Sequence, residues 1–107
     1  MSRPKIPFYK LFPAELLTDR YYGKFTTLER GMAMNLLNQQ WLENGVLPSD
    51  EEELRTIAGA TKEEWAESRD KILKWFPKIK GGRANRFMLS EWQNVDVLYQ
   101  KRVKAGQ

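Results

Sequence analysis

The sequence contains no cysteine and no histidine. Without cysteine the chain has no disulfide framework and no thiolate metal site, and without histidine it lacks the commonest general base and metal ligand. No apolar run approaches the roughly 18 residues that span a bilayer, and the first residues, MSRPKIPFYK, lack the apolar core of a signal peptide. These absences predict a cytoplasmic protein with no membrane partner.

Features that could support catalysis are few. The carboxylates of Asp50 and of the acidic run 51–53 are adjacent in sequence, so a helix would direct them to different faces. There they would interact favourably with the helix dipole and would not converge on a metal ion. The pair Gly81-Gly82 is followed neither by the ending of a phosphate-binding loop nor by a helix start. We therefore expect no enzyme activity, no catalytic residue, no metal site and no cofactor.

The size of the chain fits one domain. A chain of 107 residues with 4 Trp, 4 Tyr and 5 Phe can bury a single apolar core. We expect one domain over residues 1–107, with its core within about 7–100. The basic tail 101–107, KRVKAGQ, either frays or begins a linker to a further region.

Positive charge is concentrated late in the sequence. The net charge is +4, but residues 49–77 hold 5 basic and 8 acidic side chains, whereas residues 78–107 hold 7 basic and 2 acidic ones. A smaller share of positive charge lies at Arg3, Lys5 and Lys10. An anionic partner is expected at 78–107.

Three S/T-x-x-E patterns mark helix starts, because the hydroxyl and the carboxylate each satisfy a free backbone N–H. They are Thr26 with Glu29, Ser49 with Glu52, and Thr61 with Glu64, and they predict helices over about 27–43, 50–58 and 61–75. Apolar residues recur at helical spacing in all three. The expected core positions are Leu28, Met32, Ala33, Leu36, Leu37 and Trp41, then Leu54, Ile57 and Ala58, then Trp65, Ile72, Leu73 and Phe76.

The second and third predicted helices are separated only by Gly59-Ala60, which is typical of a helix-turn-helix. Lys78-Ile79-Lys80, a turn at Gly81-Gly82 and a return strand at 86–89 then predict a β-hairpin. Ser90 is expected to cap a last helix over about 91–103, which packs through Trp92, Val95 and Tyr99. At the other end of the chain, a short helix at about 13–17 is expected to pack across the core with Phe8, Phe12 and Leu16. This order predicts a mainly α fold with a small β-hairpin, a winged helix-turn-helix domain.

Dispersed motifs carry a resemblance to a known family. The segments PFYKLFPAELLTD, LERGMAMNLLNQQW, NGVLPSD, GATKEEW, LKWF and ANRFML, between about residues 7 and 95, resemble the YdaU-like family of uncharacterised N-terminal domains in phage and prophage proteins. One departure is Met32-Ala33, where the family usually has an aromatic residue. The resemblance implies a role near phage replication, in origin binding or in recruiting a helicase loader, within proteins that often continue into a second region.

The candidate nucleic-acid-binding residues are basic side chains of the hairpin. Long cationic side chains on an exposed turn can contact phosphates, although they can also simply keep an edge strand soluble. The third predicted helix is a poorer candidate for groove binding, because it carries as many acids as bases. The candidates are Lys78, Lys80, Arg83 and Arg86, extended by Lys101, Arg102 and Lys104 if the last helix folds back beside the hairpin.

Aromatic residues suggest a second kind of surface. Tyr21 and Tyr22 could stack on bases, belong to the core or form an interface, and Trp75 would favour an interface if it is exposed. Two hypotheses follow. The first is non-catalytic DNA binding through a basic wing in a phage replication protein; the alternative is a protein-interaction module that holds a replication partner, a host protein or a second copy, without DNA binding.

Overall fold

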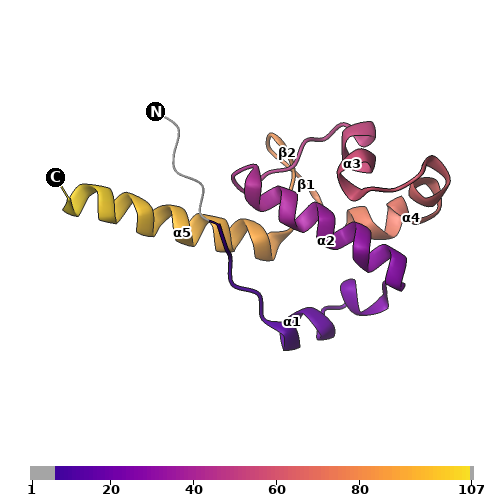
Figure 1. Ribbon diagram of the computed structural model, residues 1–107, viewed down its shortest axis with the longest axis horizontal. Helices are drawn as coiled ribbons and strands as arrows, with labels where there is room; N and C mark the ends of the chain where they lie inside the picture. Colours follow the sequence, from indigo (N-terminus) through magenta and orange to yellow (C-terminus); the bar gives the residue numbers. More distant parts are fainter. Residues whose placement is uncertain (1–6, 107) are drawn as a thin grey trace.

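The computed structural model describes residues 7–106 as a mainly helical domain with one small antiparallel pair of strands (Figure 1). The elements follow in the order α1 Pro13–Thr18, the 3-10 helix η1 Tyr22–Lys24, α2 Thr27–Leu42, α3 Glu51–Ala58, α4 Lys62–Lys74, β1 Lys78–Ile79, β2 Gly82–Arg83 and α5 Arg86–Ala105. The predicted mainly α class with a β-hairpin is confirmed.

The central helix is α2, which contacts α3, α4 and α5. Its start is the predicted capping box, in which the Thr26 hydroxyl accepts from the Glu29 backbone N–H and the Glu29 carboxylate accepts from the Thr26 backbone N–H. The predicted apolar face is buried except for Leu28, which is exposed. Asn44 and Gly45 end the helix with positive φ angles of 61° and 97°.

The helices α3 and α4 form the predicted tight pair, joined by Gly59 in the left-handed conformation. Thr61 caps α4 through the expected capping box with Glu64. The box predicted at Ser49 is wrong. The cap of α3 is Asp50, whose carboxylate accepts from the Glu53 backbone N–H at 3.0 Å, because the helix begins one residue later than the S/T-x-x-E pattern indicates.

The hairpin is shorter than predicted, and a third segment of the chain pairs with it. Lys78 pairs with Arg83 and Ile79 with Gly82, so Lys80-Gly81 is the turn. Leu47, between α2 and α3, exchanges two backbone hydrogen bonds with Arg83, of 2.7 and 3.0 Å. Gly82 permits this contact: a Cβ atom there would lie 2.0 Å from the Leu47 carbonyl oxygen.

The predicted return strand at 86–89 and the predicted cap at Ser90 are both wrong. These residues are the first turns of α5, which begins at Arg86. The Asn85 side chain caps this helix by accepting from the Met88 backbone N–H at 3.0 Å. The strand pairing therefore ends at Arg83, where the backbone turns toward the helix.

A buried glutamine ties the start of α5 to α2. The Gln40 side chain donates to the carbonyls of Gly45 and Asn85 at 2.8 and 3.1 Å and accepts from the Asn85 N–H at 2.8 Å. The Asn85 side chain also donates to the Trp75 carbonyl at 3.1 Å. Because these polar groups are buried and satisfied, they fix the corner where α4, the hairpin and α5 meet.

The helix α5 projects from the body of the domain (Figure 1). The molecule measures 52 × 30 × 22 Å, and α5 runs roughly along the longest of these axes. Trp92 and Val95 pack against the core as predicted, whereas Val97, Leu98 and Val103 are exposed. The predicted tail is helical as far as Ala105. Gln107, like Arg3 and Lys5, lies outside the described residues.

The N-terminal helix is present at the predicted place but packs only in part as predicted. Phe8 is 70% exposed and Phe12 is also exposed, so neither crosses the core. Leu16 does pack against the core as predicted, and the Tyr9 ring lies 5.5 Å from that of Trp41. The helix α1 buries none of its own residues. It therefore lies over the core without closing onto it.

Candidate functional site

Lys78 and Lys80 are exposed on the hairpin, as the sequence predicted. Lys78 is in β1, and Lys80 is in the turn. Neither lysine makes an ion pair with any residue that the structure describes. Their ammonium groups are therefore available to an anionic partner.

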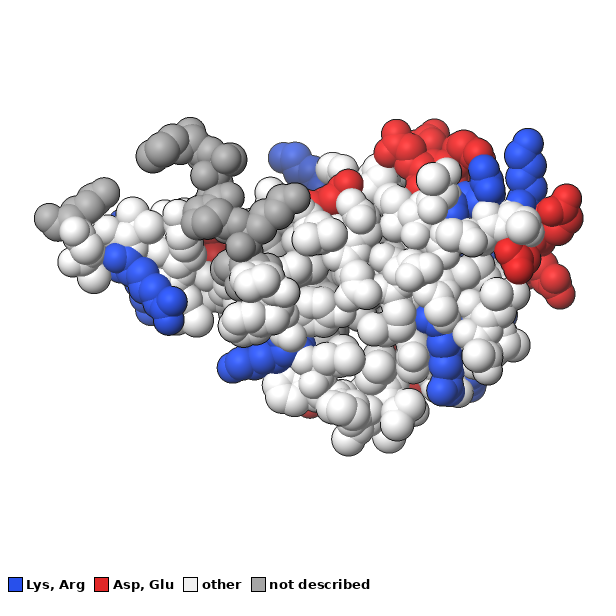
Figure 2. Space-filling model, in the orientation of Figure 1, with Lys and Arg blue, Asp and Glu red and all other residues white. Residues whose placement is uncertain are grey.

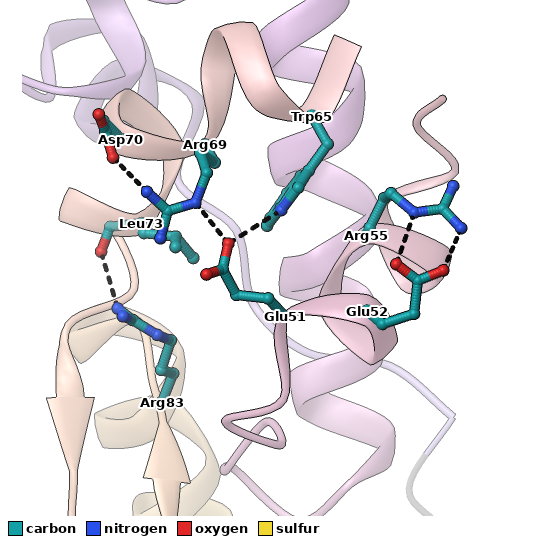
Figure 3. A network of polar contacts seen from close by, with 8 residues as sticks. All are labelled: Glu51, Glu52, Arg55, Trp65, Arg69, Asp70, Leu73 and Arg83. Atoms are coloured by element: carbon teal, nitrogen blue, oxygen red, sulfur yellow. Dashed lines mark hydrogen bonds and ion pairs between the residues drawn. The ribbon is translucent and has the colours of Figure 1, made fainter. Parts of the chain in front are cut away.

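Arg83 does not point away from the domain with the two lysines. Its guanidinium donates to the carbonyl of Phe76 at 2.9 Å. It also donates to the carbonyl of Leu73 at 3.5 Å, the contact drawn in Figure 3. These carbonyls lie at the C-terminal end of α4, where cations and donors stabilise a helix. Arg83 thus holds the hairpin against α4, and its expected contact with phosphate stays an untested prediction.

The basic residues at the far end of α5 do not extend the hairpin patch. We expected Lys101, Arg102 and Lys104 to join it if the last helix folded back, but α5 runs away from the hairpin (Figure 1). At 1.5 Å per helical residue, Lys101 lies about 22 Å from Arg86 along the axis. Arg86 is exposed in the first turn of α5. The candidate cations therefore form two separate groups.

Two arginines, Arg55 on α3 and Arg69 on α4, are held by neighbouring acids (Figure 3). The Glu51 carboxylate accepts from the Arg69 guanidinium and, at 3.2 Å, from the Trp65 indole N–H. The hydrogen bond from Arg69 is the main reason that the pKa of Glu51 lies below its usual value. Glu52 and Arg55 pair within α3. The contacts of Glu51 stabilise the packing of α3 on α4.

A further ion pair joins α4 to α2. The Lys71 ammonium lies 2.7 Å from the carboxylate of Glu29, which is only 5% exposed. Burial by itself raises the pKa of Glu29, but hydrogen bonds from Lys71, from the Thr26 backbone and from Ser68 outweigh it, so the pKa is lowered. The carboxylate stays charged at neutral pH and holds the two helices together.

The outward surface of α4 is not basic. Its three exposed acids, Glu63, Glu67 and Asp70, outnumber the two exposed lysines that form no ion pair with a described residue, Lys62 and Lys74. Figure 2 shows acidic side chains gathered at the α3–α4 end of the molecule and basic side chains on α5 at the opposite end. A helix with this surface is poorly matched to the polyanionic major groove.

Trp75 is buried, so the condition for its suggested interface role is not met. Its ring is 6% exposed and lies 5.3, 6.0 and 5.4 Å from the rings of Tyr22, Phe25 and Phe76. Tyr22 is buried in the same cluster, because α4 ends where η1 packs against the core. Tyr21 is half-buried and stays a candidate for contact with a partner.

A groove that we did not predict lies beside Tyr21, between α1, the end of α4 and the start of α5. Its volume is about 440 Å³, and its walls include the apolar side chains of Phe12, Leu16 and Phe87. Basic residues lie on it as well, namely Arg20, Lys74 and Arg86. These residues come from distant parts of the sequence, so no local pattern pointed to the groove.

Neither a metal site nor a membrane span is found among residues 7–106. No cluster of acidic side chains in this range could hold a metal ion. No helix in the same range is both long enough and apolar enough to cross a bilayer.

Comparisons with known proteins give one match. A search of curated proteins and a search of solved structures found no match. The model of one family, described as "Protein of unknown function (DUF1376)", matches residues 7–92, which is most of the chain and includes all elements from α1 to the first turns of α5. The chain therefore belongs to the DUF1376 family of proteins of unknown function.

Proposed function

We propose that this chain is a non-catalytic DNA-binding module of the winged-helix type that contacts the phosphate backbone through its hairpin. The observation that carries the proposal is the pair of exposed lysines, Lys78 and Lys80, which have no acidic partner among the described residues. They stand on a short hairpin directly after a helix-turn-helix. Exposed cations of this kind position a protein on nucleic acid.

The order of elements supports the winged-helix type. The tight pair α3–α4 is followed by β1 and β2, and Leu47, which precedes α3, bridges to Arg83 in β2. The hairpin is thus braced from the other side of the helix-turn-helix. A braced hairpin can hold its turn, at Lys80, against a duplex.

The same geometry argues against sequence reading by α4. Because its exposed acids repel phosphate, we infer that the module contacts the DNA backbone and does not read base edges. The chain has neither histidine nor cysteine to support nucleophilic or general-base chemistry, so the role is one of binding. A place in phage or prophage replication rests on the resemblance to YdaU-like domains.

The test is a titration of labelled duplex and single-stranded oligonucleotides by fluorescence anisotropy at several salt concentrations. If Lys78, Lys80 and Arg86 each neutralise one phosphate, the logarithm of the affinity falls by about 2.7 per decade of salt. The variant Lys78→Glu with Lys80→Glu should abolish binding and leave the melting temperature unchanged, because both side chains are exposed.

A charge-matched control is Lys10→Glu with Lys24→Glu. Both lysines are exposed and lie outside the hairpin, so this variant changes the net charge equally. It should bind more tightly than the hairpin variant. Equal losses in the two variants would show that only the net charge matters, and full affinity in the hairpin variant would remove the hairpin from the account.

A protein-interaction role without DNA binding is the second candidate. The observation in its favour is the acidic surface of α4, with Glu63, Glu67 and Asp70 exposed where a groove-reading helix would carry cations. This role predicts no oligonucleotide binding even at low salt. A replication protein, a host protein or a second copy could be the partner, and sedimentation analysis would identify self-association.

A further inference from the structure

We propose that the groove between α1 and the α4–α5 corner binds an amphipathic segment of a partner protein, one that presents an apolar or aromatic side chain next to a carboxylate. This inference goes beyond the proposed DNA contact, because it rests on a groove that Lys78 and Lys80 do not line. The groove, its exposed apolar rim and its unpaired cations each contribute to the argument.

The size and lining of the groove fit side chains. Its volume of about 440 Å³ lies in the range of sites that hold organic ligands, roughly 300 to 1,000 Å³. Phe12, Tyr21 and Phe87 contribute rings to its walls, and the Phe12 and Phe87 rings meet edge to face at 6.4 Å. A hollow lined by rings gains free energy when an apolar side chain displaces water from it.

The rim of the groove is unusually apolar for an exposed surface. The helix α1 buries none of its residues, and Leu11, Phe12 and Leu17 on or beside it are all exposed. Phe8, in the same N-terminal segment, is 70% exposed. Clustered apolar side chains on a surface mark interaction sites, whereas scattered ones do not. Leu11 and Phe12 line the hollow, so they supply exposed apolar contact area within it.

Charge on the walls sets the chemistry of the partner. Lys74 and Arg86 line the groove, and neither forms an ion pair within residues 7–106. Arg20 lies over the Tyr21 ring at 4.8 Å. An apolar side chain in the hollow would bring a neighbouring carboxylate to these cations. The carboxylate and these cations would form charge-assisted hydrogen bonds at a partly desolvated site.

Acids on the same groove favour a protein segment over a nucleic acid. Glu15 and Asp19 also line it, and a continuous phosphate backbone would be repelled by both. The Asp19 carboxylate is held in place by the backbone N–H groups of Tyr21 and Tyr22 at 2.8 and 2.9 Å, so it does not swing away. A peptide can direct one carboxylate toward Lys74 and Arg86 and avoid the acidic wall.

The experiment is a selection from a displayed library of 16-residue peptides on this chain, followed by titration of the most enriched synthetic peptide. Three proteins are compared with the native chain: Lys74→Glu with Arg86→Glu, Phe12→Ala, and the control Lys101→Glu with Lys104→Glu. The control makes the same change of charge at the far end of α5. All four altered cations and Phe12 are exposed, so each variant should keep the native melting temperature.

The expected result is enrichment of peptides with an aliphatic or aromatic residue within four positions of Asp or Glu. Affinity should fall by at least about tenfold in the charge variant, and similarly in Phe12→Ala, and should change by less than about twofold in the control. Replacing the peptide's Asp or Glu by Asn or Gln should cause a comparable loss on the native chain.

The inference is overturned if no peptide is enriched, if the enriched peptides carry no acid, or if the groove variants bind them as tightly as the native chain does. It is also overturned if single-stranded oligonucleotides lose binding in the groove variants while peptides do not. Arg86 is also one of the proposed phosphate contacts, so the DNA contact is judged by Lys78→Glu with Lys80→Glu, two residues that do not line the groove. Failure of the peptide test therefore leaves that DNA test independent.

Discussion

Two regions of this molecule use basic residues in different ways. Among α2, α3 and α4, Arg69 and Lys71 each pair with an acid of another helix, and Arg55 pairs with an acid of its own helix. On the hairpin, Lys78 and Lys80 have no such partner in the part of the chain that the structure describes. Positive charge thus serves internal packing in the first region and is available for binding in the second.

The comparison teaches that net charge alone does not locate a binding surface. Residues 49–77 hold 8 acidic side chains, so most of their cations find partners, whereas residues 78–107 hold only 2 acids. Even there Arg83 is engaged by backbone carbonyls. Pairing, exposure and position decide which cations can meet a partner. Four substitutions test this division, from the largest expected effect to the smallest.

The largest effect is expected from Trp65→Ala at the α3–α4 end. The ring is buried and its N–H donates to Glu51, so its loss should lower the free energy of unfolding by about 3 to 5 kcal/mol, measured by urea denaturation. Leu98→Ala on the exposed part of α5 should change it by less than about 0.5 kcal/mol. A similar loss in both proteins would contradict the contrast between a packed and a projecting end.

Gly82→Ala should break the support of the hairpin. The new Cβ would lie 2.0 Å from the Leu47 carbonyl oxygen, and the residue has φ 155°, so the strand must move and the bridge to Arg83 is lost. We expect about 3 kcal/mol of destabilisation in thermal or urea unfolding.

Gly81→Ala is the control for this change, because Gly81 also has a positive φ but a Cβ there meets no atom within 4 Å. It should cost only about 1 kcal/mol. If the two glycine variants were equally stable, the close approach to Leu47 would not be the reason for Gly82.

Glu29→Gln should weaken the contact between α2 and α4 and alter the response to acid. The pKa of the native carboxylate is lowered. The carboxylate therefore stabilises the fold at pH values above its pKa in the unfolded chain, near 4.5, and this stabilisation is lost as the pH falls through its pKa in the folded chain. The variant should be less stable by about 1 to 2 kcal/mol at pH 7. Urea midpoints at pH 7 and pH 3 should differ less in the variant; an unchanged pH dependence would contradict the role of the Lys71 contact.

Arg83→Gln should separate a structural cation from a surface cation within the same hairpin. Loss of the guanidinium removes its hydrogen bonds to the end of α4, for an expected cost of about 1 to 2 kcal/mol in the free energy of unfolding. Lys80→Gln should stay within about 0.5 kcal/mol of the native chain, because Lys80 is exposed. The reverse order of stabilities would place Lys80, and not Arg83, in the support of the hairpin.

Much of the fold was predictable because helix starts and stops are local. The capping boxes at Thr26 and Thr61 link residues three apart, and Gly59 ends α3 by its own conformation. The helical start of α5 at residues 86–89, where we predicted a return strand, was not predictable in this way. The segment ANRFML alternates like a strand, but Asn85 caps a helix and its backbone is held by Gln40, 45 positions away in the sequence.

The candidate site was predicted only in part. Lys78 and Lys80 are exposed as expected, since charged side chains at a hairpin turn stay in contact with water. The burial of Trp75 and the groove beside it depend on α1 and η1, which pack from the other end of the sequence. No spacing within the region 74–87 contains that information.

The sequence by itself determined the number and limits of most helices and the concentration of positive charge after residue 77. Only the tertiary structure decided which cations are left for a partner. Capping depends on neighbours three residues apart, whereas Glu51 meets Arg69 across 18 positions and Glu29 meets Lys71 across 42. Such pairs form because packed helices bring distant side chains within hydrogen-bond range, and the local sequence cannot specify that distance.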